Sequence, residues 1–152
     1  MTIAKRILLI DDDPAFTRMV RLCLKSSGNY SIEEENNSRN AFATARWFRP
    51  DLILLDVMMP DPDGGDIAQQ IEGDALLQGT PIVFFTGLVS EEEATSNRIG
   101  GYRFIAKPLR RDQLVSCVEE ILKTDGPSSS DSAINTALSL TARLIRPFKR
   151  QT

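Results

Sequence analysis

The sequence predicts an α/β domain, with a doubly wound, parallel, five-stranded sheet of (βα)5 topology and a helical extension at the C-terminus. Two observations carry this prediction. Short apolar runs without polar alternation are typical of strands covered on both faces, and amphipathic helical segments stand between these runs. Their regular alternation indicates parallel strands joined by right-handed crossovers. At 152 residues, 41% of them hydrophobic, the chain has room for one such domain.

Five segments have the composition of strands. Ile7-Leu8-Leu9-Ile10 and Leu52-Ile53-Leu54-Leu55 contain apolar residues only, as expected for strands buried on both faces. The segment around Ile32 is a weaker match because polar residues surround it. The predicted strands cover residues 6–10, 30–33, 52–56, 81–85 and 102–106.

The helices between these strands are indicated by their capping residues and apolar spacing. Asp13 at an N-cap and Pro14 at the first helical position begin a helix that continues to Gly28. Ser90 and Glu93 have the spacing of a capping box. Further helices are expected over residues 39–48, over 66–77 with a break near Gly73, over 90–98 and over 111–123.

Composition excludes several classes of site. The chain has no histidine, which excludes His-based catalysis, histidine metal ligands and a histidine phosphodonor within the chain. Cys23 and Cys117 stand alone on different predicted helices, so we expect reduced core thiols. No apolar run approaches the roughly 18 residues of a membrane span, and no signal peptide precedes the first strand. We therefore expect a cytoplasmic protein.

Charge is distributed unevenly along the chain. The net charge is −3, but residues 125–152 contain four basic and two acidic residues, which leaves a net charge of −5 on residues 1–124. Binding to nucleic acid requires a basic surface. An acidic domain of this kind argues against direct nucleic-acid binding.

Polar side chains stand at the ends of four predicted strands: Asp11 and Asp12, Asp56, Thr86 and Lys107. The carboxyl ends of parallel strands meet at one edge of a sheet, where α/β proteins bind ligands. Three carboxylates at this edge raise one another's pKa values unless a cation is bound, and oxygen-only ligands suit Mg²⁺. With the metal, the hydroxyl of Thr86 and the ammonium of Lys107 can hold a phosphoryl group on Asp56.

In these residues the sequence resembles the receiver domains of two-component response regulators. The resemblance covers residues 4–124 and is specific because four separate motifs match. The motifs are Ile7-Leu8-Leu9-Ile10-Asp11-Asp12, Leu54-Leu55-Asp56-Val57-Met58-Met59-Pro60 with Asp63-Gly64, Phe85-Thr86-Gly87 and Ala106-Lys107-Pro108.

The resemblance implies a role for each residue of the edge. Asp56 is the phosphoacceptor and binds Mg²⁺ together with Asp12, with Asp11 through water and with the main-chain carbonyl of Met58. Thr86 and Lys107 bind the phosphoryl group. The strand order is the flavodoxin-like 2-1-3-4-5.

Two further features follow from the same resemblance. The peptide bond between Lys107 and Pro108 is expected to be cis, as cis bonds belong to proline. Phe104 takes the place of the aromatic residue that moves inward with Thr86 on activation. Tyr is commoner there, so a contact through a hydroxyl is lost while a packing switch is retained. Gly87 replaces the usual alanine and leaves access to the phosphoryl group open.

These observations predict a single-domain response regulator of a two-component phosphorelay. A histidine kinase or histidine phosphotransfer protein would phosphorylate Asp56, and any catalysis would be confined to phosphorylation and dephosphorylation of this residue. The residues after Thr124 are too few for a DNA-binding or enzymatic output domain. We therefore expect output through contact with a downstream protein, and a homodimer is a further option.

Two alternatives use the same residues differently. A haloacid-dehalogenase-like, Mg²⁺-dependent phosphatase would have Asp11 as its nucleophile, but its motif requires Thr or Val where Ala15 stands and leaves Asp56 unexplained. A pseudo-receiver would bind partners without phosphorylation. The complete set of acidic residues, threonine and lysine argues against it.

The tail after residue 124 is predicted from composition and spacing. The composition of residues 125–130 indicates a flexible linker. Within residues 131–152, an amphipathic helix is expected to begin at Asp131 and to end near Arg146. Its apolar face docks onto the receiver domain or a dimer mate, binds an acidic protein or an anionic membrane surface, or stays disordered. That face consists of Ile134, Ala137, Leu138, Thr141, Leu144 and Ile145.

Overall fold

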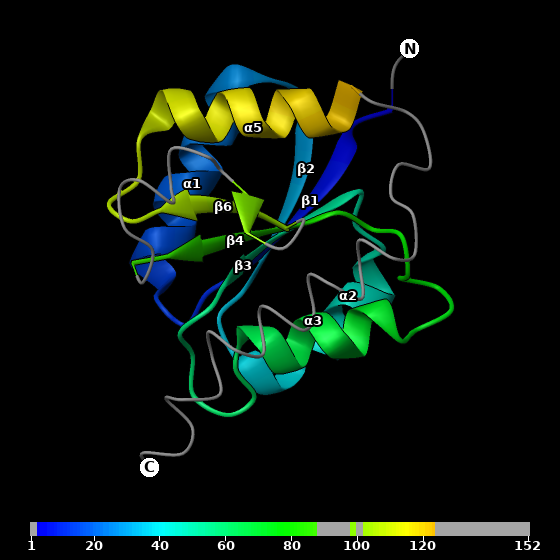
Figure 1. Cartoon of the computed structure of the whole chain (residues 1–152). Helices are drawn as coiled ribbons and strands as arrows, with labels where there is room; N and C mark the ends of the chain where they lie inside the picture. Colours follow the sequence, from blue (N-terminus) through cyan, green and yellow to red (C-terminus); the bar gives the residue numbers. More distant parts are fainter. Residues whose placement is uncertain (1–2, 88–97, 100–101, 124–152) are drawn as a thin grey trace.

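The computed structural model describes residues 3–87, 98–99 and 102–123 and contains one sheet between two layers of helices (Figure 1). The strands are β1 (Lys5–Ile10), β2 (Tyr30–Glu35), β3 (Leu52–Asp56), β4 (Ile82–Thr86), β5 (Arg98–Ile99) and β6 (Tyr102–Ala106). The helices are α1 (Pro14–Ser27), η1 (Ser38–Asn40), α2 (Ala41–Phe48), α3 (Gly64–Glu72) and α5 (Arg111–Lys123).

The order of the strands in the sheet is β2-β1-β3-β4-β6-β5. All pairs are parallel except β5 with β6. Without the short β5, the parallel strands have the predicted order 2-1-3-4-5, which is confirmed. This order places β1, β3, β4 and β6 side by side, so their carboxyl ends form one continuous edge.

Each central strand is buried on both faces. Helices α1 and α5 cover one face of the sheet, and α2 and α3 cover the other (Figure 1). Ile7 and Leu9 face the α1/α5 core, whereas Leu8 and Ile10 face the α2/α3 core. Burial of each such side chain contributes roughly 1.5–3 kcal/mol, which explains why these strands are apolar throughout. The two cores fix the register of β1 and β3, and with it the position of the residues that follow.

Helix α1 begins as the sequence predicts. Oδ1 of Asp13 accepts a hydrogen bond from the amide of Ala15 (3.0 Å), and Pro14 occupies the first helical position. The helix ends at Ser27, where the amide of Gly28 donates to the carbonyl of Leu24 (3.2 Å). The start of α1 therefore lies immediately after the carboxyl end of β1.

Several boundaries differ from the prediction. Strand β2 continues two residues further, to Glu35, and η1 precedes α2. Helix α3 begins at Gly64 rather than at residue 66, because Asp63 and Asp66 cap it: each carboxylate accepts from the other's amide (2.9 and 3.2 Å). It ends at Glu72 with Gly73 as its C-cap, so the predicted break near Gly73 is confirmed. The sequence signal that was missed is Asp63 at the N-cap.

One predicted helix is wrong at its C-terminal end. Arg98 and Ile99 form β5, in which Ile99 pairs with Tyr102 of β6. A strand of two residues is too short to give an apolar period, which explains why the sequence did not predict it. The rest of that predicted helix, residues 90–97, lies outside the described residues, and so do the linker and tail over residues 125–152.

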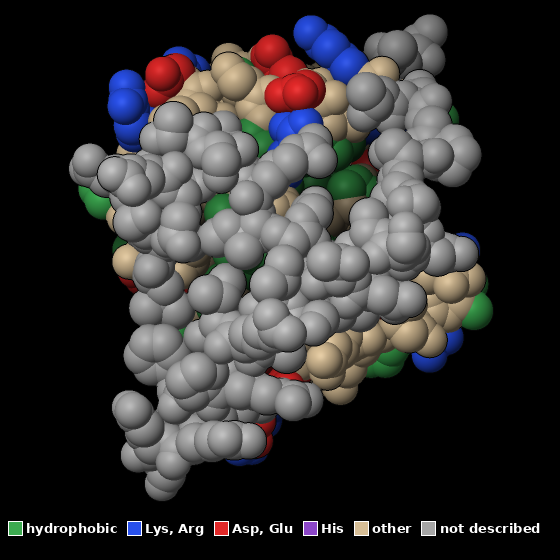
Figure 2. Space-filling model, in the orientation of Figure 1, with side chains coloured by type: hydrophobic (Ala, Val, Ile, Leu, Met, Phe, Trp, Pro, Cys, Tyr) green, Lys and Arg blue, Asp and Glu red, His purple; other side chains and the backbone are tan. Residues whose placement is uncertain are grey.

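Helix α5 closes the α1/α5 core with Leu114 and Val118. Along its outer surface, at the top of Figure 2, acidic and basic side chains stand together. Glu120 of α5 accepts two hydrogen bonds from the guanidinium of Arg103 (3.0 and 3.1 Å), which ties α5 to β6. Both cysteines are half-buried thiols, and Nη1 of Arg103 lies 4.0 Å from Sγ of Cys117. No helix in the described ranges combines the length and the apolar composition that crossing a bilayer requires.

Candidate functional site

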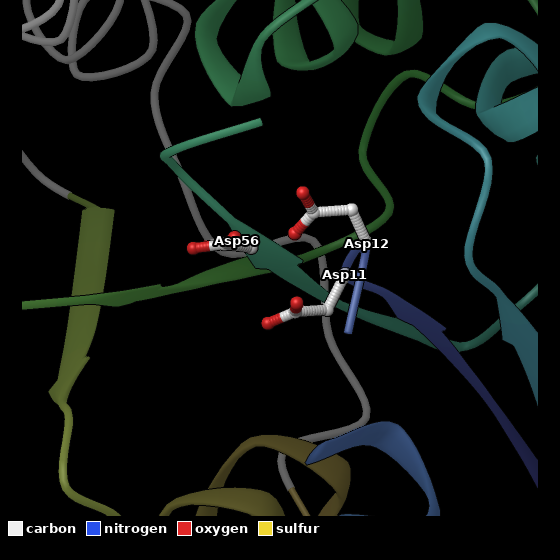
Figure 3. A group of neighbouring side chains, drawn as sticks. All are labelled: Asp11, Asp12 and Asp56. Carbon is white, nitrogen blue, oxygen red and sulfur yellow. The ribbon is translucent and has the colours of Figure 1, made fainter. Parts of the chain in front are cut away.

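Three aspartates meet at the carboxyl edge of the sheet (Figure 3). Asp11 and Asp12 follow β1 and Asp56 ends β3, and carboxylate oxygens of all three lie within 4.8 Å of one another. Asp11 and Asp56 are only 2% and 4% exposed, whereas Asp12 is exposed. Within the described residues, this is the one group of three or more acidic or cysteine side chains close enough to share an ion.

The acidic turn after β1 is held by hydrogen bonds from two directions. The amide of Asp13 donates to Oδ1 of Asp11 (2.9 Å), which orients this carboxylate. From the loop after β2, Nδ2 of Asn36 donates to the carbonyl of Asp11 (2.8 Å) and to Oγ1 of Thr17 (3.0 Å). The side chain of Asn36 thus fastens the turn to α1.

Asp56 lies where β3 meets the following loop. The amide of Met58 donates to its Oδ1 (3.3 Å), and the amide of Val57 donates to the carbonyl of Phe85 in β4 (3.1 Å). Burial, and then the charge of Asp11, raise the pKa of Asp56 from 3.8 to about 6. Burial also raises the pKa of Asp11. Both carboxylates therefore favour a nearby cation.

Lys107 brings that positive charge from the end of β6. Its Nζ donates to Oδ2 of Asp11 (2.8 Å) and lies 3.5 Å from Oδ1 of Asp56. Burial lowers the pKa of Lys107, but the hydrogen bond to Asp11 and the charges of both aspartates outweigh this, so the pKa is raised. The ammonium is also 4.3 Å from the centre of the Phe16 ring. It therefore stays charged inside the site.

The remaining predicted residues lie on β4 and β6. Thr86 is 1% exposed at the end of β4, and its carbonyl accepts from the amide of Lys107 (3.0 Å). Phe104 lies apart from the aspartates, in the α2/α3 core, where its ring stacks on Phe84 (5.4 Å between centroids). It is already buried in this structure, being 3% exposed.

Two peptide bonds near this edge are cis: Lys107-Pro108 and Asp61-Pro62. The first is the bond for which the sequence predicted this isomer. The second lies in the loop between β3 and α3, and no sequence pattern indicated it.

The model of the response regulator receiver domain matches residues 7–119. The chain belongs to the response regulator receiver family. Receiver domains typically bind Mg²⁺ at an acidic pocket, and this receiver domain has the corresponding aspartate cluster. The strand order and the position of that cluster at the carboxyl edge agree with the membership.

The curated relatives are regulators of which this chain covers only a part. The response regulator Rre1 of Synechocystis is 31% identical over 95% of this chain, which covers 63% of that protein. The phosphate regulon transcriptional regulatory protein PhoB of Pseudomonas aeruginosa is 31% identical over 87% of this chain, which covers 58% of that protein. The chain thus spans about three fifths of the length of these relatives.

Solved receiver structures match over nearly their whole length. The chemotaxis protein CheY4 of Vibrio cholerae has a TM-score of 0.67 and 26% identity, over 78% of this chain and 99% of that one. The receiver domain of a histidine kinase from Syntrophus aciditrophicus has a TM-score of 0.69 and 30% identity, over 84% of this chain and 96% of that one.

Sequence reasoning missed two residues of this receiver site. Asn36 follows β2, the only parallel strand to which no functional residue was assigned, and its place at the carboxyl end was the available signal. Phe16 lies in the first turn of the helix that was predicted from Pro14 to Gly28, and no site role was assigned to it. Its contact with Lys107 brings together residues that are far apart in the sequence, which no local pattern shows.

Proposed function

We propose that this receiver domain is phosphorylated on Asp56 by a histidine kinase or histidine phosphotransfer protein. One observation carries the proposal: the carboxylate of Asp56 is buried beside two other aspartates and lies 3.5 Å from a lysine ammonium. A buried nucleophile next to fixed positive charge suits transfer of a phosphoryl group, because the charge that moves onto the phosphoryl oxygens is compensated in place.

The transfer is a substitution at phosphorus. A carboxylate oxygen of Asp56 attacks the phosphorus of a phosphohistidine, and the bond between phosphorus and nitrogen breaks. The electron pair stays with the departing imidazole, which takes a proton from water. The product is an acyl phosphate on Asp56. The ammonium of Lys107 and the hydroxyl of Thr86 are proposed to bind the phosphoryl oxygens.

The acidic cluster fits a Mg²⁺ ion. Its donors are carboxylate oxygens only, and two of them are buried with raised pKa values, so a divalent cation would relieve their repulsion. Asp12 and Asp56 are proposed to bind the ion directly, with Asp11 through water and with the main-chain carbonyl of Met58. When bound, the ion would supply positive charge that neutralises the phosphoryl oxygens.

The response to phosphorylation is proposed to run through Thr86 and Phe104. A phosphoryl group adds a charge of about −1.5 to −2. Attraction of the Thr86 hydroxyl to the phosphoryl group would shift the end of β4. Phe104 lies on β6, the strand that pairs with β4. Thr86 pairs with Ala106, and Phe104 stacks on Phe84 two residues earlier on both strands. A movement of one strand end therefore reaches this aromatic pair.

Output is proposed to occur through a downstream protein. Residues 1–124 carry a net charge of −5, which disfavours contact with DNA. Several relatives are named as DNA-binding or transcriptional regulators. Binding of the phosphorylated chain to duplex DNA, measured by fluorescence anisotropy, would refute this part of the proposal.

The test of the proposed function is incubation with acetyl phosphate and Mg²⁺, followed by intact-mass measurement. We expect one labile phosphoryl group, which is absent in Asp56→Asn and after chelation of the metal. Turnover of donor without a stable label, lost in Asp11→Asn, would support the haloacid-dehalogenase-like phosphatase instead. No label and no turnover would support a pseudo-receiver.

A further inference from the structure

The ammonium of Lys107 has an aromatic neighbour besides its two carboxylates. Nζ lies 2.8 Å from Asp11, 3.5 Å from Asp56 and 4.3 Å from the centre of the Phe16 ring. Cations within about 6 Å of a ring centroid are attracted by the negative face of the ring. The side chain of Lys107 is 29% exposed, so this attraction acts in a partly desolvated place.

The Phe16 ring is itself fixed in position. Its amide donates to the carbonyl of Asp13 (3.1 Å), which places the residue in the first turn of α1. The ring meets Phe85 edge-on, with centroids 5.1 Å apart and planes at 86°. Phe85 is 2% exposed and immediately precedes Thr86. Phe16 therefore rests on the core and cannot turn away without losing this contact.

We propose that Phe16 is a positioning residue, whose ring face holds the ammonium of Lys107 beside Asp56 for phosphoryl transfer. This inference rests on the proposed function. Asp11 alone is poorly suited to hold the ammonium, because a carboxylate that also interacts with a metal ion attracts the lysine less strongly. A neutral ring face does not compete for the metal. It leaves the donors of the ammonium free to turn from Asp11 to a phosphoryl oxygen.

Position matters for Lys107 because its side chain is long and flexible. Immobilising a lysine costs conformational entropy, and a ring that restricts the side chain before the donor arrives reduces that cost during the reaction. A leucine or methionine at position 16 would fill much of the same volume but would lack the negative face. The electrostatic role can thus be separated from the packing role.

The first experiment is NMR of the Lys107 ε-methylene group, assigned with Lys107→Arg. Protons above a ring face are shifted upfield, so we expect an upfield signal in the wild type and in Phe16→Tyr. We expect an ordinary lysine signal in Phe16→Leu, and in Phe16→Met should the leucine variant not fold. Leu22→Ala, an exposed apolar position on the same helix, is the matched control. An ordinary signal in the wild type would overturn the proposal without any phosphorylation measurement.

The second experiment is the rate of phosphorylation by acetyl phosphate at saturating Mg²⁺. We expect the maximal rate of Phe16→Leu to fall about 3- to 10-fold, with the half-saturating donor concentration little changed. Phe16→Tyr should restore the rate to within about twofold of the wild type. Equal rates in all variants, or equal losses in the leucine and tyrosine variants, would overturn the inference alone. A wild type that accepts no phosphoryl group would overturn the proposed function as well.

Discussion

Lys107 is bound more closely to Asp11 than to Asp56. Its Nζ is 2.8 Å from Oδ2 of Asp11 and 3.5 Å from Oδ1 of Asp56, although Asp56 is the proposed acceptor. The ammonium thus neutralises part of the negative charge that would otherwise attract a metal ion to the acidic cluster. Ion and lysine are expected to compete.

The first prediction concerns this competition. Lys107→Gln should raise the affinity for Mg²⁺ severalfold, because it removes a positive charge within a few ångström of the proposed ligands. Isothermal titration calorimetry measures the effect. Lys123→Gln, an exposed lysine at the end of α5, is the control and should bind as the wild type does. An affinity that is unchanged or lower in Lys107→Gln would contradict the proposed overlap.

The second prediction is a dependence of stability on pH. The pKa of Asp56 is raised from 3.8 to about 6, so between these values the folded chain binds a proton that the unfolded chain does not. Stability should fall as the pH rises through this window. Asp56→Asn should therefore raise the free energy of unfolding by about 1–3 kcal/mol above pH 6, and give no advantage near pH 4.

Urea unfolding at both pH values, with a chelator present, measures this difference. Asp112→Asn, which removes an exposed carboxylate from α5, should have little effect at either pH. A stabilisation by Asp56→Asn of the same size at both pH values would show that ionisation is not its cause.

The third prediction concerns the approach of α3 to the end of β3. A Cβ at Gly64 would lie 2.4 Å from the carbonyl oxygen of Asp56 and 2.8 Å from Cα of Val57. Because both atoms are backbone, Gly64→Ala should destabilise the domain by about 1–3 kcal/mol and slow phosphorylation. Gly87→Ala is the control for stability, since a Cβ added there would meet no atom within 4 Å beyond the adjacent residues. Equal stability of the two variants would refute the argument.

The fourth prediction concerns the lifetime of the phosphoryl group. Met58 stands two residues after Asp56, with a side chain that is 47% exposed and offers no group to orient water. Leu88, two residues after Thr86, lies outside the described residues. We expect slow loss of phosphate, and faster loss in the Met58→Asn, Leu88→Glu double variant. Met19→Asn, an exposed methionine on α1, serves as control; decay in the double variant that is no faster than in this control would count against the prediction.

The fifth prediction concerns the tail over residues 125–152. Truncation after Lys123 should leave phosphorylation of Asp56 intact and change self-association or partner binding, because an isolated helix of about 15 residues is marginal in water and needs a covering surface. Light scattering, lipid co-sedimentation and partner pull-down compare the two chains. Identical behaviour in all three would mean that the tail is passive.

The sequence predicted the sheet because its strands are buried on both faces. Ile7 to Ile10 have no polar residue, and a strand of this kind gives a clear signal. The cap at Asp13 was equally local and was confirmed. The aspartate cluster followed from chain position, because residues after parallel strands share an edge.

Other features depend on contacts between distant residues. The hydrogen bonds of Asn36 and the ring of Phe16 reach partners on other elements, and nothing in the neighbouring sequence specifies them. Strand β5 exists only through its pairing with β6. The early start of α3 is different, since Asp63 and Asp66 gave a local capping signal that favoured Gly64 as the first helical residue.

The charges of the site come from strands that are far apart in the sequence. The carboxylates follow β1 and end β3, whereas the ammonium follows β6, which lies between β4 and the short β5. Any partly folded state in which β1 and β3 are paired before β6 docks therefore contains the repelling carboxylates without their lysine. Electrostatics favours docking of the last strand in such a state. Acid or divalent cations should therefore stabilise any such state.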